Sequence, residues 1–263
     1  MHNFDFVRPT TIADAVSALG GDEAQALGGG QTLLPAMKQR LAAPETLVSL
    51  TGINEMVGVC KTDDGALSIG GATTHAEVAR EAAADFPGLA GLAGHIGDPA
   101  VRNRGTIGGS LANNDPAACY PAAALGTGAT IVTNSREIAA DDYFQGMFTT
   151  ALEEGEIITE VRLPIPEASN YQKFLQPASR FALTGIFVAK YADGVRVAVT
   201  GASEDGVFRW SEAEAALSGS FQPEAVDGLT VSADGMIRDL HGSPEYRAHL
   251  VKVMTKRAVA AAA

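Results

Sequence analysis

The sequence predicts an α+β protein in two parts, divided near residue 166. A strand, a glycine turn, a helix and a second strand follow one another in residues 24–50, and this order favours two parallel strands. After residue 181, two strand-like runs flank Ala192-Asp193-Gly194, which is a hairpin signal and favours antiparallel strands. Helical spacing in WSEAEAAL and PEYRAHLVKVMTKRAV adds helices to this second part.

Composition and charge limit the class of protein. The chain has 263 residues, 46% hydrophobic and 19% charged, which is typical of a globular protein. Its net charge of -12 argues against a nucleic-acid partner. With no apolar run of about 18 residues and no signal-peptide pattern, we expect no membrane span and a cytoplasmic location.

Cysteine and histidine content argues against a metal centre held by this chain. The two cysteines, Cys60 and Cys119, cannot form a disulfide framework or supply the four thiolates of a cluster. The five histidines lack ligand spacing. We therefore expect no metal ligands, and ordinary surface or core histidines.

Periodicity and capping signals predict the individual elements. Thr10 or Thr11 can cap a helix over residues 11–19, and Thr74 with Glu77 forms a capping box on THAEVAREAA. We expect a further helix over 87–95 and strands over 46–50, 66–69, 129–133 and 157–163. PIPEASN, residues 164–170, is predicted to be a linker, and residues 258–263 a weakly held tail.

The first glycine cluster, GGGQTLLPAMK, lies between a predicted strand and a predicted helix. Glycines there let a phosphate approach backbone amides, so residues 28–33 are a candidate phosphate cradle. A Walker loop would need Lys where Gln31 stands, and a Rossmann fingerprint would need Gly where Leu33 stands. On this interpretation, Gly29→Val should abolish cofactor binding and leave the fold intact. The alternative is a tight turn with only a structural role.

The second cluster, RGTIGGSLANNDPAACYPAAA, covers residues 104–124. It combines glycines with the hydroxyls of Thr106 and Ser110 and the polar side chains of Asn113, Asn114 and Asp115. Small residues around them would leave volume for an extended ligand. The alternative is a buried crossing where backbones pack closely, which also favours Gly and Ala.

The two clusters together resemble a known family. GGGQTLLPAMK followed by RNRGTIGGSLANNDPAACYPAA is similar to the FAD-binding medium subunit of molybdenum hydroxylases, of the xanthine dehydrogenase and carbon monoxide dehydrogenase type. FDFVRPTTIADAV, GEIITEVRLPIP and FLQPASRFAL extend the resemblance over nearly the whole chain. It implies a vanillyl-alcohol-oxidase (PCMH)-type fold: an FAD-binding domain over 1–166, with α/β subdomains over about 1–54 and 55–166. A C-terminal α/β domain with an antiparallel sheet and helices would cover 167–263.

The resemblance also implies cofactor contacts. Relatives commonly carry Asp at the position of Cys119, where it bonds the cofactor, and Lys or His at that of Gln176. We therefore expect one cofactor contact to be lost or replaced at Cys119, because a thiol is a weak donor. The implied FAD-binding residues are Gly28, Gly29, Gly30, Gln31, Thr32, Leu33, Thr106, Gly108, Gly109, Ser110, Asn113, Asp115, Cys119, Ile157, Ile158 and Gln176.

The function implied is electron transfer rather than substrate chemistry. In such enzymes a large molybdopterin-binding subunit hydroxylates the substrate, and a small [2Fe-2S] subunit passes electrons to the FAD, which reduces NAD or another acceptor. A dimer of heterotrimers is the expected assembly, and this chain would supply no catalytic side chain. Two alternatives stay open: a stand-alone FAD-dependent oxidase or reductase of the same fold, and a scaffold protein without flavin.

Overall fold

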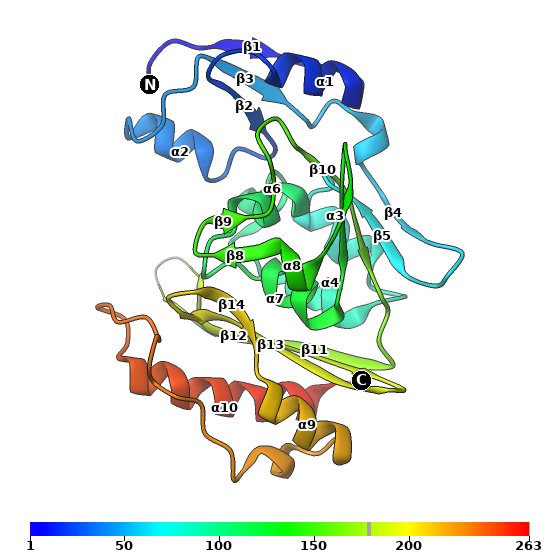
Figure 1. Ribbon diagram of the computed structural model, residues 1–263, viewed down its shortest axis with the longest axis vertical. Helices are drawn as coiled ribbons and strands as arrows, with labels where there is room; N and C mark the ends of the chain where they lie inside the picture. Colours follow the sequence, from blue (N-terminus) through cyan, green and yellow to red (C-terminus); the bar gives the residue numbers. More distant parts are fainter. Residues whose placement is uncertain (178–179, 263) are drawn as a thin grey trace.

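The computed structural model describes residues 1–177 and 180–262, and its elements lie in three layers along the long axis (Figure 1). The N-terminal layer is a three-stranded parallel sheet of order β1-β3-β2 with two helices. Thr11 caps the first helix by accepting a hydrogen bond from the Asp14 amide, and Ala15 and Leu19 face the core, as predicted. The elements are β1 (Asp5–Val7), α1 (Ile12–Leu19), β2 (Ala24–Leu27), α2 (Leu33–Lys38) and β3 (Thr46–Ser49).

The middle layer is a five-stranded antiparallel sheet of order β4-β5-β10-β6-β7. Its central strand, β10, is the last of the five in the sequence and lies between β5 and β6. The strands are β4 (Val59–Lys61), β5 (Leu67–Gly70), β6 (Thr130–Thr133), β7 (Glu137–Ala139) and β10 (Ile158–Leu163).

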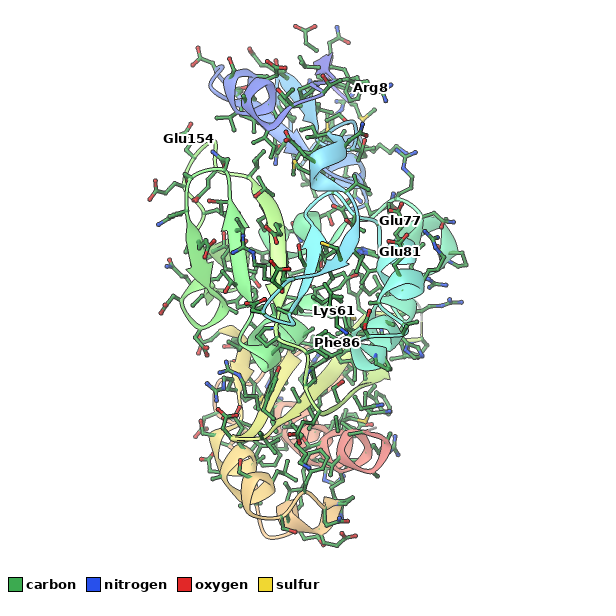
Figure 2. The ribbon with its side chains drawn as sticks, turned by 90° about the vertical axis from the view of Figure 1, so that its right-hand side faces the viewer. Arg8, Lys61, Glu77, Glu81, Phe86 and Glu154 are labelled. Atoms are coloured by element: carbon green, nitrogen blue, oxygen red, sulfur yellow. The ribbon has the colours of Figure 1, made fainter. Side chains whose placement is uncertain are left out.

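Short helices surround this middle sheet. The predicted capping box is present on α3: the Thr74 amide donates to Glu77 (3.0 Å), and the Glu77 amide donates to Thr74 Oγ1 (3.3 Å). In the perpendicular view of Figure 2, Lys61 lies close to Phe86, and its Nζ pairs with Asp85 at 2.6 Å. The remaining elements are η1 (Asn54–Met56), α3 (His75–Glu81), α4 (Pro87–Gly94), α5 (Pro99–Arg102), α6 (Ile107–Asn113), α7 (Tyr120–Thr127), α8 (Ala140–Tyr143) and the hairpin β8 (Phe144–Gly146) and β9 (Thr149–Thr150).

The C-terminal layer is a four-stranded antiparallel sheet of order β11-β12-β13-β14. Along β12, Phe187 points to the core shared with the middle layer, whereas Ile186 and Val188 point to the core under the C-terminal helices. This strand is therefore covered on both faces (Figure 1). The elements are β11 (Ala168–Leu175), β12 (Ala182–Tyr191), β13 (Gly194–Ser203), β14 (Gly206–Arg209), α9 (Ser211–Gly219), η2 (Pro223–Val226) and α10 (Pro244–Ala261).

Two expectations about segments are wrong. The predicted linker over 164–170 ends early, because β11 begins at Ala168 and pairs with β12. Residues 258–261 of the predicted weak tail form the last turn of α10, where Ala258 and Val259 are buried, and residue 263 lies outside the described residues. Short alanine-rich ends look weakly held in sequence, but burial of two side chains fixes this one.

The open volume expected around the small residues of the second cluster is not found along α7. All eight residues of α7 are buried between the middle and C-terminal layers. A Cβ on Gly126 would lie 3.1 Å from Phe187 and 3.3 Å from Ala198. Ala122, Ala123 and Ala124 are therefore small because a helix packs closely on a sheet, which was the alternative interpretation.

None of the helices in the described part of the chain has the length and apolar character needed to cross a membrane.

Candidate cofactor site

The first glycine loop presents backbone donors without partners. It follows β2 and leads into α2, and Gly30 adopts a positive φ of 72° that favours glycine. Among the described residues, no group accepts a hydrogen bond from the amides of residues 28–32. Orphaned amides that face one point bind anions such as phosphate. The loop can therefore hold a negatively charged group.

The structure brings the two glycine loops into direct contact. A Cβ on Gly28 would lie 2.8 Å from Thr106 Oγ1, and one on Gly29 would overlap the Arg104 carbonyl and come within 2.5 Å of Gly105 Cα. Gly29 is thus required by backbone packing. The expectation that Gly29→Val leaves the fold intact is wrong, because the added side chain would force the loops apart.

The backbone amides of the second loop donate hydrogen bonds to other groups of the protein. Ile107 donates to Thr73 O (3.1 Å) and Gly108 to Gly71 O (2.9 Å). The next two amides both donate to Thr106, that of Gly109 to Oγ1 (3.2 Å) and that of Ser110 to its carbonyl (3.0 Å). This loop can therefore offer a ligand the half-buried hydroxyl of Ser110, but not the amides of residues 107–110; Thr106 is 2% exposed and its hydroxyl already accepts from Gly109.

The buried side chain of His75 packs against the second loop. A Cβ on Gly105 would lie 2.5 Å from His75 Nε2, and the ring centroid of His75 is 5.3 Å from that of Tyr120. Burial, with a smaller contribution from Arg102, lowers the pKa of His75 to about 4. Its role is structural, consistent with the expectation of an ordinary core histidine, although its position under the loop gave no signal in the sequence.

Three polar residues, Asn113, Asn114 and Asp115, lie at the C-terminal end of α6, and the middle one has a structural role. Asn114, 2% exposed with φ 42°, donates to Gly146 O (2.8 Å) and Thr149 O (2.9 Å). It clamps the β8–β9 hairpin. Its neighbours Asn113 and Asp115 are half-buried, and burial raises the pKa of Asp115. These two side chains are the ones available to a ligand.

Cys119 lies beside the C-terminal sheet. It is 5% exposed, and its Sγ accepts a hydrogen bond from Lys173 Nζ at 3.5 Å. Lys173 also donates to Arg180 O (2.9 Å). Sequence reasoning did not single out Lys173, because it lies in β11, which the sequence had not indicated as a strand. Gln176 lies just past the end of β11, and its backbone amide donates to Phe181 O (2.9 Å).

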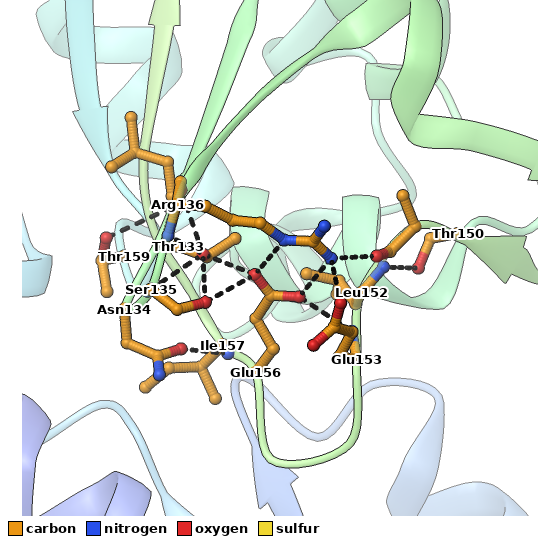
Figure 3. Close-up of polar contacts among 12 residues, drawn as sticks. Thr133, Asn134, Ser135, Arg136, Thr150, Leu152, Glu153, Glu156, Ile157 and Thr159 are labelled. Atoms are coloured by element: carbon orange, nitrogen blue, oxygen red, sulfur yellow. Dashed lines mark hydrogen bonds and ion pairs between the residues drawn. The ribbon is translucent and has the colours of Figure 1, made fainter.

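The two isoleucines expected among the FAD-binding residues are almost fully buried. Ile157 and Ile158 are each 4% exposed, and they belong to the cores of the N-terminal and middle layers respectively. Little of either surface is left for a ligand. Ile157 is held in place because its amide donates to Asn134 Oδ1 at 2.8 Å (Figure 3).

Glu156 organises the loop that ends at these isoleucines (Figure 3). Its side chain is 3% exposed and bonds Arg136 through both oxygens, each at 3.0 Å. It also accepts from Thr133 Oγ1 (2.7 Å), Ser135 Oγ (2.9 Å) and the Glu153 amide (2.8 Å). The Arg136 guanidinium, followed by the other donors, lowers the pKa of Glu156 to about 2.

Two layers that meet at a loop of free amides, backed by a second loop with two hydroxyls, define a binding protein for a phosphate-bearing cofactor. A cavity of about 590 Å³ lies elsewhere, between Gly128 and Ser218, and its Arg196 and Arg209 are already paired with Asp141. The glycine loops are therefore the better candidate.

Comparison with known proteins identifies the cofactor. Residues 2–166 match the family "FAD binding domain in molybdopterin dehydrogenase". The chain is 33% identical to the carbon monoxide dehydrogenase medium chain of Afipia carboxidovorans, over 98% of this chain and 96% of that one. It is 34% identical to the nicotine 6-hydroxylase medium subunit of Paenarthrobacter nicotinovorans, over 97% and 95%. A Cu,Mo-CO dehydrogenase structure superposes with a TM-score of 0.88 at 32% identity, over 98% and 97%.

The chain belongs to this family of FAD-binding medium subunits, it is an oxidoreductase component, and FAD is its cofactor. The expected α+β, PCMH-type fold is confirmed. The residues present fit the cofactor, because the unpartnered amides over residues 28–32 suit a pyrophosphate.

Proposed function

We propose that this chain is the electron-transfer subunit of a heteromeric molybdenum hydroxylase, taking electrons from [2Fe-2S] clusters and passing them to NAD or another external acceptor. The observation that carries the proposal is the row of free amides over residues 28–32 beside the second loop. FAD supplies the redox chemistry when bound. The protein supplies anion binding, orientation and a rigid frame.

The proposed partners are a large molybdopterin-binding subunit and a small [2Fe-2S] subunit, assembled as a dimer of heterotrimers. Support comes from the relatives' names, which describe medium chains and medium subunits. The chain's own two cysteines cannot hold a four-thiolate cluster. We propose a cytoplasmic location, in keeping with cysteines that are both free thiols.

The proposed site assigns roles to the expected residues. Residues 28–33 hold the pyrophosphate through their amides, and Thr106 and Ser110 add hydroxyls. Gly108 and Gly109 act by close packing, which shapes the wall of the site. Asn113, Asp115, Cys119 and Gln176 line the approach to the ribityl chain and flavin, and Ile157 and Ile158 back the adenine end. The FAD-binding domain covers 1–166, with subdomains over about 1–54 and 55–166, and the C-terminal domain covers 167–263.

An absorption spectrum combined with reconstitution tests this function. We expect the purified chain to show a flavin band near about 450 nm, as isolated or after incubation with FAD and desalting. A native complex stripped of this chain should still reduce its iron–sulfur clusters with substrate but lose reduction of the external acceptor. Adding back the FAD-loaded chain should restore that step. A native complex that reduces its acceptor equally well without this chain would contradict the proposal.

A further inference from the structure

Cys119 and Lys173 form an isolated nucleophile pair between the middle and C-terminal layers. Cys119 is the N-cap residue of α7, and Lys173 lies in β11, so the contact of 3.5 Å joins segments far apart in the sequence. Among the described residues no carboxylate lies within ion-pair distance of Lys173, whose other partner is the Arg180 carbonyl. Among the described residues, Lys173 therefore contacts the Cys119 sulfur and the Arg180 carbonyl, and no carboxylate.

A third group completes the pair. The Tyr171 hydroxyl is buried beside the Cys119 thiol and has no nitrogen or oxygen partner among the described residues. Burial, and then the neighbouring thiol, raise the pKa of Tyr171 well above its usual value, so the hydroxyl keeps its proton. Sulfur is a weak hydrogen-bond acceptor, and an oxygen atom on it would give this hydroxyl a stronger one.

We propose that Cys119 is an oxidation site at which Lys173 captures the oxidised sulfur as a covalent S–N cross-link. The oxidant is hydrogen peroxide, which takes two electrons from sulfur: the thiol and peroxide give a sulfenic acid and one water. The Lys173 amine then attacks sulfur, the S–O bond breaks, and the S–N bond forms. The hydroxyl leaves as a second water, with one ammonium proton released to solvent.

The surroundings favour capture over further oxidation. The Tyr171 hydroxyl can donate to the sulfenic oxygen and so assist its departure as water. With Cys119 only 5% exposed, a second peroxide reaches sulfur less readily than an amine already in contact with it. The exposed Cys60, in β4, has no such neighbour among its described hydrogen bonds and provides an internal comparison. The cross-link would tie α7 to β11.

Mass spectrometry of the full-length Cys60→Ser protein after peroxide treatment tests the cross-link. We expect the intact mass to fall by about 2 Da, because two hydrogens are lost, and to recover with dithiothreitol. After trypsin, residues 105–136 should be joined to residues 163–180, with cleavage after Lys173 blocked. Dimedone, which traps sulfenic acid, should label Cys119 weakly.

Lys173→Arg is the matched control, since a guanidinium keeps the charge and hydrogen bond but stays protonated. In this variant we expect several-fold more dimedone labelling of Cys119 and no linked peptide. Addition of oxygen atoms to Cys119 without a link in the Lys173 protein would overturn the proposal, as would a Cys119 that peroxide leaves unchanged. A linked product heavier than the reduced pair by about 14 Da would contradict a direct S–N bond. These readouts do not depend on FAD binding or electron transfer.

Discussion

The two glycine loops have similar compositions but use their backbones in opposite ways. Loop 28–33 leaves a row of amides without partners, whereas the amides of residues 107–110 all donate within the protein. We propose that the first loop binds the cofactor, whereas the amides of the second loop hold that loop against the rest of the protein. Gly29 lies where the two meet, because a Cβ there would overlap the backbone of Arg104.

This difference shows that glycine enrichment has two physical causes that a sequence does not separate. One is access of a ligand to free amides, and the other is close approach of two backbones. Gly108 illustrates the second cause, because an added Cβ would lie 2.6 Å from the Gly71 carbonyl. The predictions below act on one loop, on the contact between the loops, or on the frame that supports them.

The largest effect is expected where the loops touch. Gly29→Ala should lower the free energy of unfolding by about 3–5 kcal/mol and abolish FAD retention, because backbone atoms cannot move aside as a side chain would. Gly91→Ala, in the exposed face of α4 with open space around it, should be neutral or stabilising by up to about 1 kcal/mol. Thermal unfolding and flavin content measure both. If Gly29→Ala unfolds like the parent, the loops are not packed as described.

The next effect is expected from His75, which packs against Gly105 of the second loop and against Tyr120. Its pKa is lowered from 6.5 to about 4, so the unfolded chain binds a proton that the folded chain refuses. Stability should therefore fall as pH decreases from about 6.5 to about 4, by roughly 3 kcal/mol in total. Unfolding in urea across this range, compared with His75→Gln, isolates the contribution. If stability changes equally with pH in the two proteins, His75 does not cause this pH dependence.

A smaller effect is expected from Glu156, which holds together the loop that leads into β10. Glu156→Gln should cost about 2 kcal/mol, because a buried carboxylate with five donors loses its charge. Glu153→Gln, whose side chain is 78% exposed beside the same Arg136, should cost less than about 0.5 kcal/mol. Chemical denaturation at neutral pH provides the comparison, and similar losses in both variants would contradict the network.

The pKa of about 2 for Glu156 adds a pH signature to this pair of variants. A lowered carboxyl pKa stabilises the fold above the unfolded value of 4.5, and the benefit is lost as pH falls through about 2. Glu156→Gln should therefore flatten the acid side of the stability curve. The Glu153→Gln curve should keep the parent's shape.

The smallest structural effect is expected from Ser110, whose hydroxyl makes no hydrogen bond to the described residues. Ser110→Ala should change the free energy of unfolding by less than about 0.5 kcal/mol and weaken FAD binding by roughly 1 kcal/mol. Thr106→Val should do both, because Thr106 Oγ1 also caps α6 through the Gly109 amide. Titration with FAD separates the two residues. Unchanged affinity in Ser110→Ala would remove it from the site.

Local signals predicted most elements but not their neighbours. The capping box on α3 and the hairpin at Ala192-Asp193-Gly194 follow from residues a few positions apart, and both are confirmed. β11 was missed because its buried positions include Ser169 and Tyr171, so its alternation is weak in sequence. The insertion of β10 between β5 and β6, and the contact of Gly29 with Arg104, are long-range arrangements that no short window contains.

The central claim is that FAD is held through the amides of the first loop and not those of the second. Hydrogen–deuterium exchange of the chain with and without FAD tests it most directly. Without FAD, amides of residues 28–32 should exchange rapidly, and those of residues 107–110 slowly. With FAD, the first set should become protected while the second changes little. Protection that appears on FAD binding at residues 107–110, with residues 28–32 unchanged, would contradict the account.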